Sequence, residues 1–109
     1  MSTLTAGEVF PLESLVALTP HGIASRVLAR TPAGNITLFA FDAGEELSEH
    51  TAPFDALVLT VSGALALTIG GVPTATAPQT IVVMPANVPH AVRAIEESRM
   101  LLIMLRGSA

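Results

Sequence analysis

The stretch that decides the fold is GEELSEHTAPFDALVLTVSG, residues 44–63. It places His50 six residues after Gly44 and thirteen residues before Gly63. Between the histidine and the second glycine runs ALVLTVS, which is almost continuously apolar and rich in residues that suit a pleated sheet. A strand this apolar is typical of one buried on both faces. We therefore expect a buried strand that follows a histidine-bearing loop and ends at a glycine.

The rest of the chain repeats this design of short extended runs separated by Gly, Pro, Asn and Asp. Such spacing predicts an all-β sandwich or barrel. We interpret the runs on either side of Ser62–Gly63 as a hairpin, and Gly70–Gly71 as the next turn. The expected strands cover residues 22–30, 35–42, 56–63, 64–71, 80–87, 90–96 and 99–106.

One segment departs from the β pattern. In FPLESLVAL, residues 10–18, Pro11 suits the first position of a helix. Leu12, Leu15 and Val16 then follow the i, i+3, i+4 spacing of a helical face. The sequence therefore predicts a short N-terminal helix in front of the β domain.

Composition limits the classes of function. Half of the 109 residues are hydrophobic and only 13% are charged, so we expect one domain with apolar strand surface left for a homodimer interface. The net charge of −4, with scattered basic residues, argues against a nucleic-acid partner. No run approaches the roughly 18 apolar residues of a membrane span. There is no leader-like start and no glycine-rich phosphate loop, so we expect a cytoplasmic protein without a nucleotide or organic cofactor.

The glycines and histidines together resemble the two motifs of the cupin superfamily, which are small double-stranded β-helix barrels. The first motif runs Gly, five residues, His-x-His, three or four residues, Glu, six residues, Gly. The second runs Gly, five residues, Pro-x-Gly, two residues, His, three residues, Asn. Gly44, His50 and Gly63 match the first motif, and Pro85 and His90 match the second.

The resemblance implies an all-β, single-domain cupin-like barrel over residues 1–109, with its core at about 22–105 and a short N-terminal helix. It also implies a metal site of three histidines and one glutamate, of which only His50 and His90 are present. The asparagine that replaces the second-motif glycine is a mild change, because Asn tolerates the left-handed conformation. The departures from the motifs are Ala52, Ala56, Asn87 and Ala94.

Two carboxylates are candidates for a third ligand of a divalent metal ion. Asp55 lies one residue before the lost glutamate, and because side chains alternate across a strand it needs a bulge near Pro53 to face His50. Glu46 has the same parity as His50 but falls in an expected loop. Either would complete a set of two histidines and one carboxylate, the type that holds non-haem iron.

The barrel cavity is the expected binding site, since small ligands lodge in barrel mouths. Three functions stay open: a small-molecule binder with a depleted, weakly held metal site, a metal-dependent dioxygenase or isomerase, and a structural or sensory dimer with a dry cavity. Fold alone does not choose between them. The residues expected to line the cavity beside the two histidines are Arg26, Phe39, Phe41, Ala52, Phe54 and Ala56.

Overall fold

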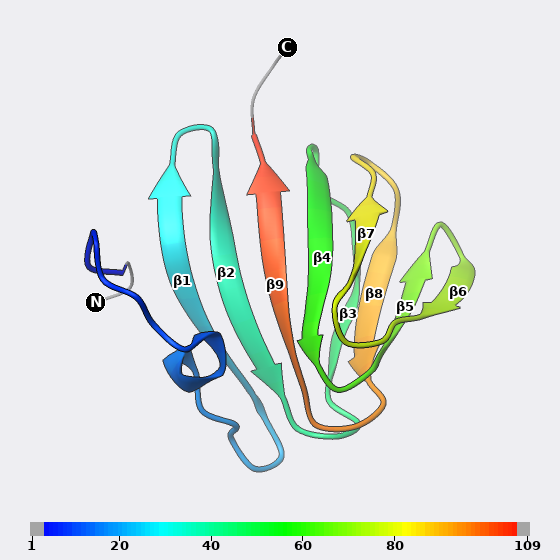
Figure 1. The fold of residues 1–109 in the computed structure, drawn as a ribbon. Coiled ribbons are helices and arrows are strands. Elements are labelled where there is room, and N and C mark those ends of the chain that lie inside the picture. The colour runs from blue at the N-terminus through cyan, green and yellow to red at the C-terminus, as the bar shows by residue number, and fades with distance from the viewer. Residues whose placement is uncertain (1–3, 107–109) are drawn as a thin grey trace.

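The computed structural model describes residues 4–106. These residues form two antiparallel sheets that face each other (Figure 1). The five-stranded sheet has the order β1 (Ile23–Thr31), β2 (Gly34–Phe41), β9 (Ser98–Leu105), β4 (Asp55–Ser62) and β7 (Thr80–Met84). The four-stranded sheet has the order β3 (Glu46–His50), β8 (His90–Ala94), β5 (Leu65–Ile69) and β6 (Val72–Ala75). The all-β prediction is confirmed. Within these residues, none of the helical structure is long and apolar enough to cross a membrane.

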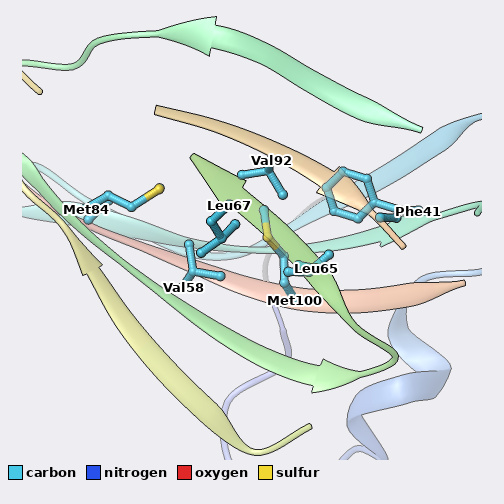
Figure 2. Packing of buried hydrophobic residues seen from close by; sticks show 9 residues of the cluster. Phe41, Val58, Leu65, Leu67, Met84, Val92 and Met100 are labelled. Carbon is cyan, nitrogen blue, oxygen red and sulfur yellow. The ribbon is translucent and has the colours of Figure 1, made fainter. Parts of the chain in front are cut away.

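The core lies between the two sheets, where side chains from both meet (Figure 2). On β4, Ala56, Val58 and Thr60 are buried at every second position, which is the period of one face of a strand. Leu65 and Leu67 of β5 approach the same interior from the opposite sheet. Burial of these side chains is therefore what holds the sheets face to face.

The N-terminal segment covers part of the outer face of the five-stranded sheet. A single turn of 3-10 helix, Leu12–Leu15, packs with Val16 against Leu38 and Ala40 of β2. The predicted helix is thus confirmed in place, but it is shorter than residues 10–18. Pro11 precedes it in an extended conformation with ψ of 120°, and Val16 is already extended. The chain is extended from Val16 onward, and this residue is buried against Leu38 and Ala40 of β2.

The predicted hairpin at Ser62–Gly63 is wrong. Strand β4 pairs with β7 and β9, whereas β5 pairs with β6 and β8, so the chain crosses from one sheet to the other at this point. Gly63 has a φ of +79°, and a Cβ there would run into the carbonyl of Glu97 and the hydroxyl of Ser98. In the structure, the two apolar runs face the same interior from opposite sheets. Two strands of one hairpin would have the same apolar sequence pattern, so the sequence does not distinguish the two arrangements.

The turn at Gly70–Gly71 is confirmed as a two-residue hairpin loop between Ile69 and Val72. Both glycines have positive φ, 58° and 79°, as the tight hairpin turns that follow strand twist require. This loop joins β5 to β6. Strands β3 and β6 were not predicted, because both are largely exposed and lack an apolar pattern.

Candidate functional site

A pair of histidines lies at one end of the four-stranded sheet. His50 ends β3, His90 begins β8, and the two are opposite each other in the ladder. Their Nε2 atoms are 3.1 Å apart, and their rings cross at 75° with centroids separated by 4.3 Å. His90 is buried at 4% exposure, while His50 is exposed. One ring of the pair is therefore accessible to solvent, and the other lies in the barrel interior.

Each ring of the pair has a backbone carbonyl as a hydrogen-bond partner. The Nδ1 of His50 is 2.9 Å from the carbonyl of Ser48, and the Nδ1 of His90 is 3.2 Å from the carbonyl of Val88. A carbonyl oxygen only accepts, so a neutral ring that donates from Nδ1 presents the lone pair of its Nε2, and the two Nε2 atoms lie at hydrogen-bond distance from each other. Two acceptors thus converge on one point, where a proton or a hydrogen-bond donor would satisfy both.

Electrostatics favour the neutral form of the buried member of the pair. Burial lowers the pKa of His90 below its ordinary value of 6.5, and repulsion from a protonated His50 lowers it further. The hydrogen bond to the Val88 carbonyl acts in the opposite direction. The net lowering of its pKa favours a neutral His90 at neutral pH, so that one of its ring nitrogens can accept a hydrogen bond.

The pair opens onto a cavity of about 250 Å³ between the sheets. Four of the expected lining residues, Phe39, Ala52, Phe54 and Ala56, do line it. All lining side chains except the two imidazoles are apolar, so the cavity is a hydrophobic chamber with one polar corner. Its remaining walls are formed by Leu47, Met84, Val92, Met100, Leu102 and Met104.

Two other expected lining residues lie elsewhere. Phe41 is fully buried and stacks on Phe39 with ring centroids 6.0 Å apart, so it belongs to the core beside the cavity. Arg26 donates from Nη1 to the carbonyl of Leu15, at 3.5 Å, in the segment that covers the outer face of the five-stranded sheet. Strand alternation therefore sends Arg26 away from the cavity.

Neither candidate carboxylate joins the histidine pair. Asp55 precedes the inward Ala56, and its Oδ1 accepts a hydrogen bond of 2.8 Å from the backbone amide of Ala86. Glu46 is opposite Arg93 and lines a hollow on the outside of the sheet. A register shift between Leu47 and His50 lets both of these residues face inward, and it places Glu46 on the other face.

The described residues do not fit the usual metal centre of cupins. Within residues 4–106, no third His, Cys, Asp or Glu completes a metal-binding group around the pair. A catalytic zinc site has three protein ligands, whereas the pair offers two nitrogen atoms. Ala52 and Ala56 bring methyl groups into the cavity where the motif has a histidine and a glutamate.

Several cavity residues were not identified from the sequence. Met100, Leu102 and Met104 recur at every second position of β9, which is the period of one strand face. That period was available in the sequence, but the run MLLIML is apolar throughout, so neither face stands out. Leu47 had no such signal, because the register shift that turns it inward is a property of the pairing with β8.

Comparison with known proteins supports the fold. The family model described as the cupin domain matches residues 37–106. A solved protein of unknown function from Streptococcus pyogenes is 33% identical, with 97% of this chain and 93% of that chain covered and a TM-score of 0.90. A cupin superfamily protein from Desulfitobacterium hafniense is 29% identical, with 95% of each chain covered and a TM-score of 0.89.

A third solved structure, a conserved-barrel cupin domain protein from Leptotrichia buccalis, is 36% identical with a TM-score of 0.84. The alignment covers 88% of this chain but 47% of that protein. No protein with a curated description matches. The match of the family model to well over half of the residues, together with the two shared motifs, establishes that this chain belongs to the cupin family.

Proposed function

We propose that this chain binds a small, largely apolar molecule in the barrel cavity and holds a proton-donating group of that molecule at His50 and His90. The observation that carries the proposal is the convergence of two Nε2 acceptors on a chamber whose other walls are apolar. At about 250 Å³ the chamber is larger than the roughly 150 Å³ cavity known to bind benzene. A substituted ring of modest size is a suitable occupant.

The chemistry of the walls supports such a ligand. Apolar side chains gain free energy by removing apolar ligand surface from water. The buried His90 acceptor loses hydration inside the chamber, and a hydroxyl or acid proton of the ligand would replace what is lost. Binding would therefore combine a hydrophobic contact with one oriented hydrogen bond.

The two competing functions have less support. A metal-dependent dioxygenase or isomerase needs a further ligand, and Asp55 and Glu46 both face away from the pair. A structural role with a dry cavity is compatible with a hydrogen bond within the histidine pair, but it gives no use to the apolar chamber of about 250 Å³ beside it.

Phenol is a suitable probe, because it combines an apolar ring with one proton donor. In protein labelled at the methionine methyl groups, we expect phenol to shift the NMR signals of Met84, Met100 and Met104, which all line the cavity. Toluene, which lacks the hydroxyl, should bind roughly 2- to 12-fold more weakly, the equivalent of one net hydrogen bond.

A cavity-filling variant controls for binding elsewhere. Ala52→Leu should abolish the phenol shifts, whereas Ala91→Leu, on β8 and facing the outside of the sheet, should leave them unchanged. Phenol shifts that survive in Ala52→Leu, or their absence at millimolar phenol in the unmodified protein, would contradict the proposal.

A further inference from the structure

A positively charged residue, Arg106, follows the residues of β9 that line the cavity. Met100, Leu102 and Met104 point into the chamber, and Arg106 follows at the next position of the same parity. The guanidinium carbon of Arg106 lies 4.9 Å from the centre of the Phe54 ring, which is itself a cavity wall. Arg106 therefore stands beside the chamber, in contact with its lining.

A second arginine, Arg30, lines the same hollow as Arg106. Arg30 of β1 is opposite Asn35 of β2, and Asn35 is opposite the cavity residue Met104 of β9. Arg30, Asn35 and Arg106 line one hollow of about 300 Å³ together with Thr31 and Pro32. Figure 1 shows the β1–β2 turn, the end of β9 and the start of β8, where His90 lies, at the same end of the molecule.

The charges of this hollow are uncompensated by the part of the chain that the structure describes. Arg99 forms an ion pair with Glu13 at 3.9 Å, but neither Arg30 nor Arg106 reaches a carboxylate of residues 4–106. The Oδ1 of Asn35 is buried and has no hydrogen-bond partner there. In a chain with net charge −4, two of the five basic residues thus meet at a pocket without acidic residues.

We propose that Arg30 and Arg106 bind an oxyanion of the molecule whose apolar body occupies the cavity. Guanidinium groups match carboxylate and phosphate oxygens in two-point hydrogen bonds, which makes arginine the preferred partner of such groups. The side-chain NH2 group of Asn35, which lines the same hollow, can donate a hydrogen bond to an oxyanion, whereas its unpaired Oδ1 only accepts. The inference rests on the cavity binding proposed above and narrows the ligand class to small amphipathic anions that carry a proton donor at their other end.

Three probes with one ring and one hydroxyl separate the parts of this proposal: phenol, 4-hydroxybenzoate and 4-hydroxyphenyl phosphate. In calorimetric titrations at low salt, we expect an anionic probe to bind about tenfold more tightly than phenol, as one charge-assisted contact would give. The preferred anion identifies the source of the oxyanion as carboxylate or phosphate. The preference should shrink as salt is raised, because exposed charges are screened.

Arginine variants test the residues. Arg30→Met and Arg106→Met should each remove most of the preference for the anion, and Arg30→Met should leave the affinity for phenol nearly unchanged. Arg30→Met is the cleaner variant, because Arg106 also contacts Phe54. Arg93→Met is the matched control, since Arg93 lies in the hollow on the outside of the other sheet.

The outcomes separate this inference from the cavity proposal. Anionic probes that bind no better than phenol, or a preference that persists in both variants, would overturn the oxyanion site and leave the cavity proposal intact. Anion binding that needs both arginines but is unaffected by Ala52→Leu would keep the oxyanion site and overturn the cavity proposal.

Discussion

At residues 52 and 56, two methyl groups stand in the cavity that His50 and His90 share. Side chains at these positions already point into the chamber, so their identity decides whether a metal ion has enough ligands. An imidazole and a carboxylate there would raise the number of protein ligands from two to four, the number of a closed zinc site.

We therefore expect Ala52→His with Ala56→Glu to bind Zn²⁺ at one ion per chain. Its affinity should exceed that of the unmodified protein by at least about 100-fold, since losing only an outer-shell partner costs 10–100-fold. Isothermal titration calorimetry measures this. The same residue types at outward positions, Ala66→His with Ala91→Glu, should give no gain. If Ala52→His with Ala56→Glu stays folded but its affinity for Zn²⁺ is unchanged, positions 52 and 56 do not share the site with the histidines.

His90 should make stability depend on pH. Its pKa in the folded protein is lowered, chiefly by burial, below the value of 6.5 expected for the unfolded chain. The unfolded state therefore binds more protons, and the free energy of unfolding should fall as pH drops below about 6.5. Denaturant unfolding between pH 7.5 and 5 measures this loss.

In that experiment, His90→Gln should flatten the pH dependence, and His50→Gln should reduce it by removing the charge repulsion. Asp42, whose pKa is lowered by hydrogen bonds from the amides of His21 and Ala43, titrates below 3.8 and so stays outside the range. A slope that is identical in His90→Gln would mean that His90 is not the group responsible.

At the scale of elements, the crossing between β4 and β5 carries more constraint than a hairpin turn would. Gly63 combines a φ of +79° with close contact to Glu97 and Ser98, which begin the return of the chain along β9. The Ser98 hydroxyl accepts a hydrogen bond of 3.0 Å from the backbone amide of Ala64. This bond ties the crossing segment to the start of β9.

Gly63→Ala should therefore destabilise the protein more than Gly44→Ala. Both positions have positive φ, which costs a residue with a Cβ about 1–2 kcal/mol. A Cβ on Gly44 meets open space, whereas a Cβ on Gly63 collides with backbone atoms, so only Gly63→Ala forces strands apart. Thermal or denaturant unfolding compares the two, and equal losses would refute the tight crossing.

Across the whole molecule, residues 4–106 cover only one side of the outer face of the five-stranded sheet. The N-terminal segment packs over one side of it, on β1, β2 and β9. The other side carries aliphatic residues in register across the strands, with Leu101 at the border of the covered part: Leu57, Ile103 and Val83 in one row and Leu59, Leu101 and Ile81 in the next. Ile81 and Val83 are 58% and 51% exposed, and neither row contains a charge.

We expect a second copy of this chain to cover that face, because an uncharged aliphatic sheet surface is complementary to itself and two-fold dimers are the commonest oligomers. Light scattering should give twice the 11.2 kDa of the chain. Val83→Glu should produce monomers, whereas Val72→Glu, at an exposed position of β6 in the other sheet, should not. A mass of 11.2 kDa for the unmodified protein at micromolar concentration would exclude the dimer.

The class of the fold and, through the motif spacings, the pairing of the two histidines could be predicted from the amino-acid sequence. Short apolar runs between turn residues suffice for an all-β prediction, because strand period and turn chemistry are local properties. The motif spacings placed His50 and His90 in one family pattern, and the structure brings their rings together. The left-handed Asn87, with a φ of 62°, was also predictable. Gln79 adopts a similar φ of 66° six residues before Pro85, without a residue type that signals it.

The sheet that each strand joins and the side chains that reach the cavity could not be predicted from the amino-acid sequence. Runs buried on both faces carry no alternation, so their sequence does not reveal that β4 and β5 belong to different sheets. The register shift between Leu47 and His50 reverses the parity of Glu46, and it arises from pairing with β8, more than forty residues away in the chain. The meeting of Arg30 with Arg106 depends likewise on long-range pairing through β2. Hydrogen bonds between distant strands, and not local preferences, fix these positions.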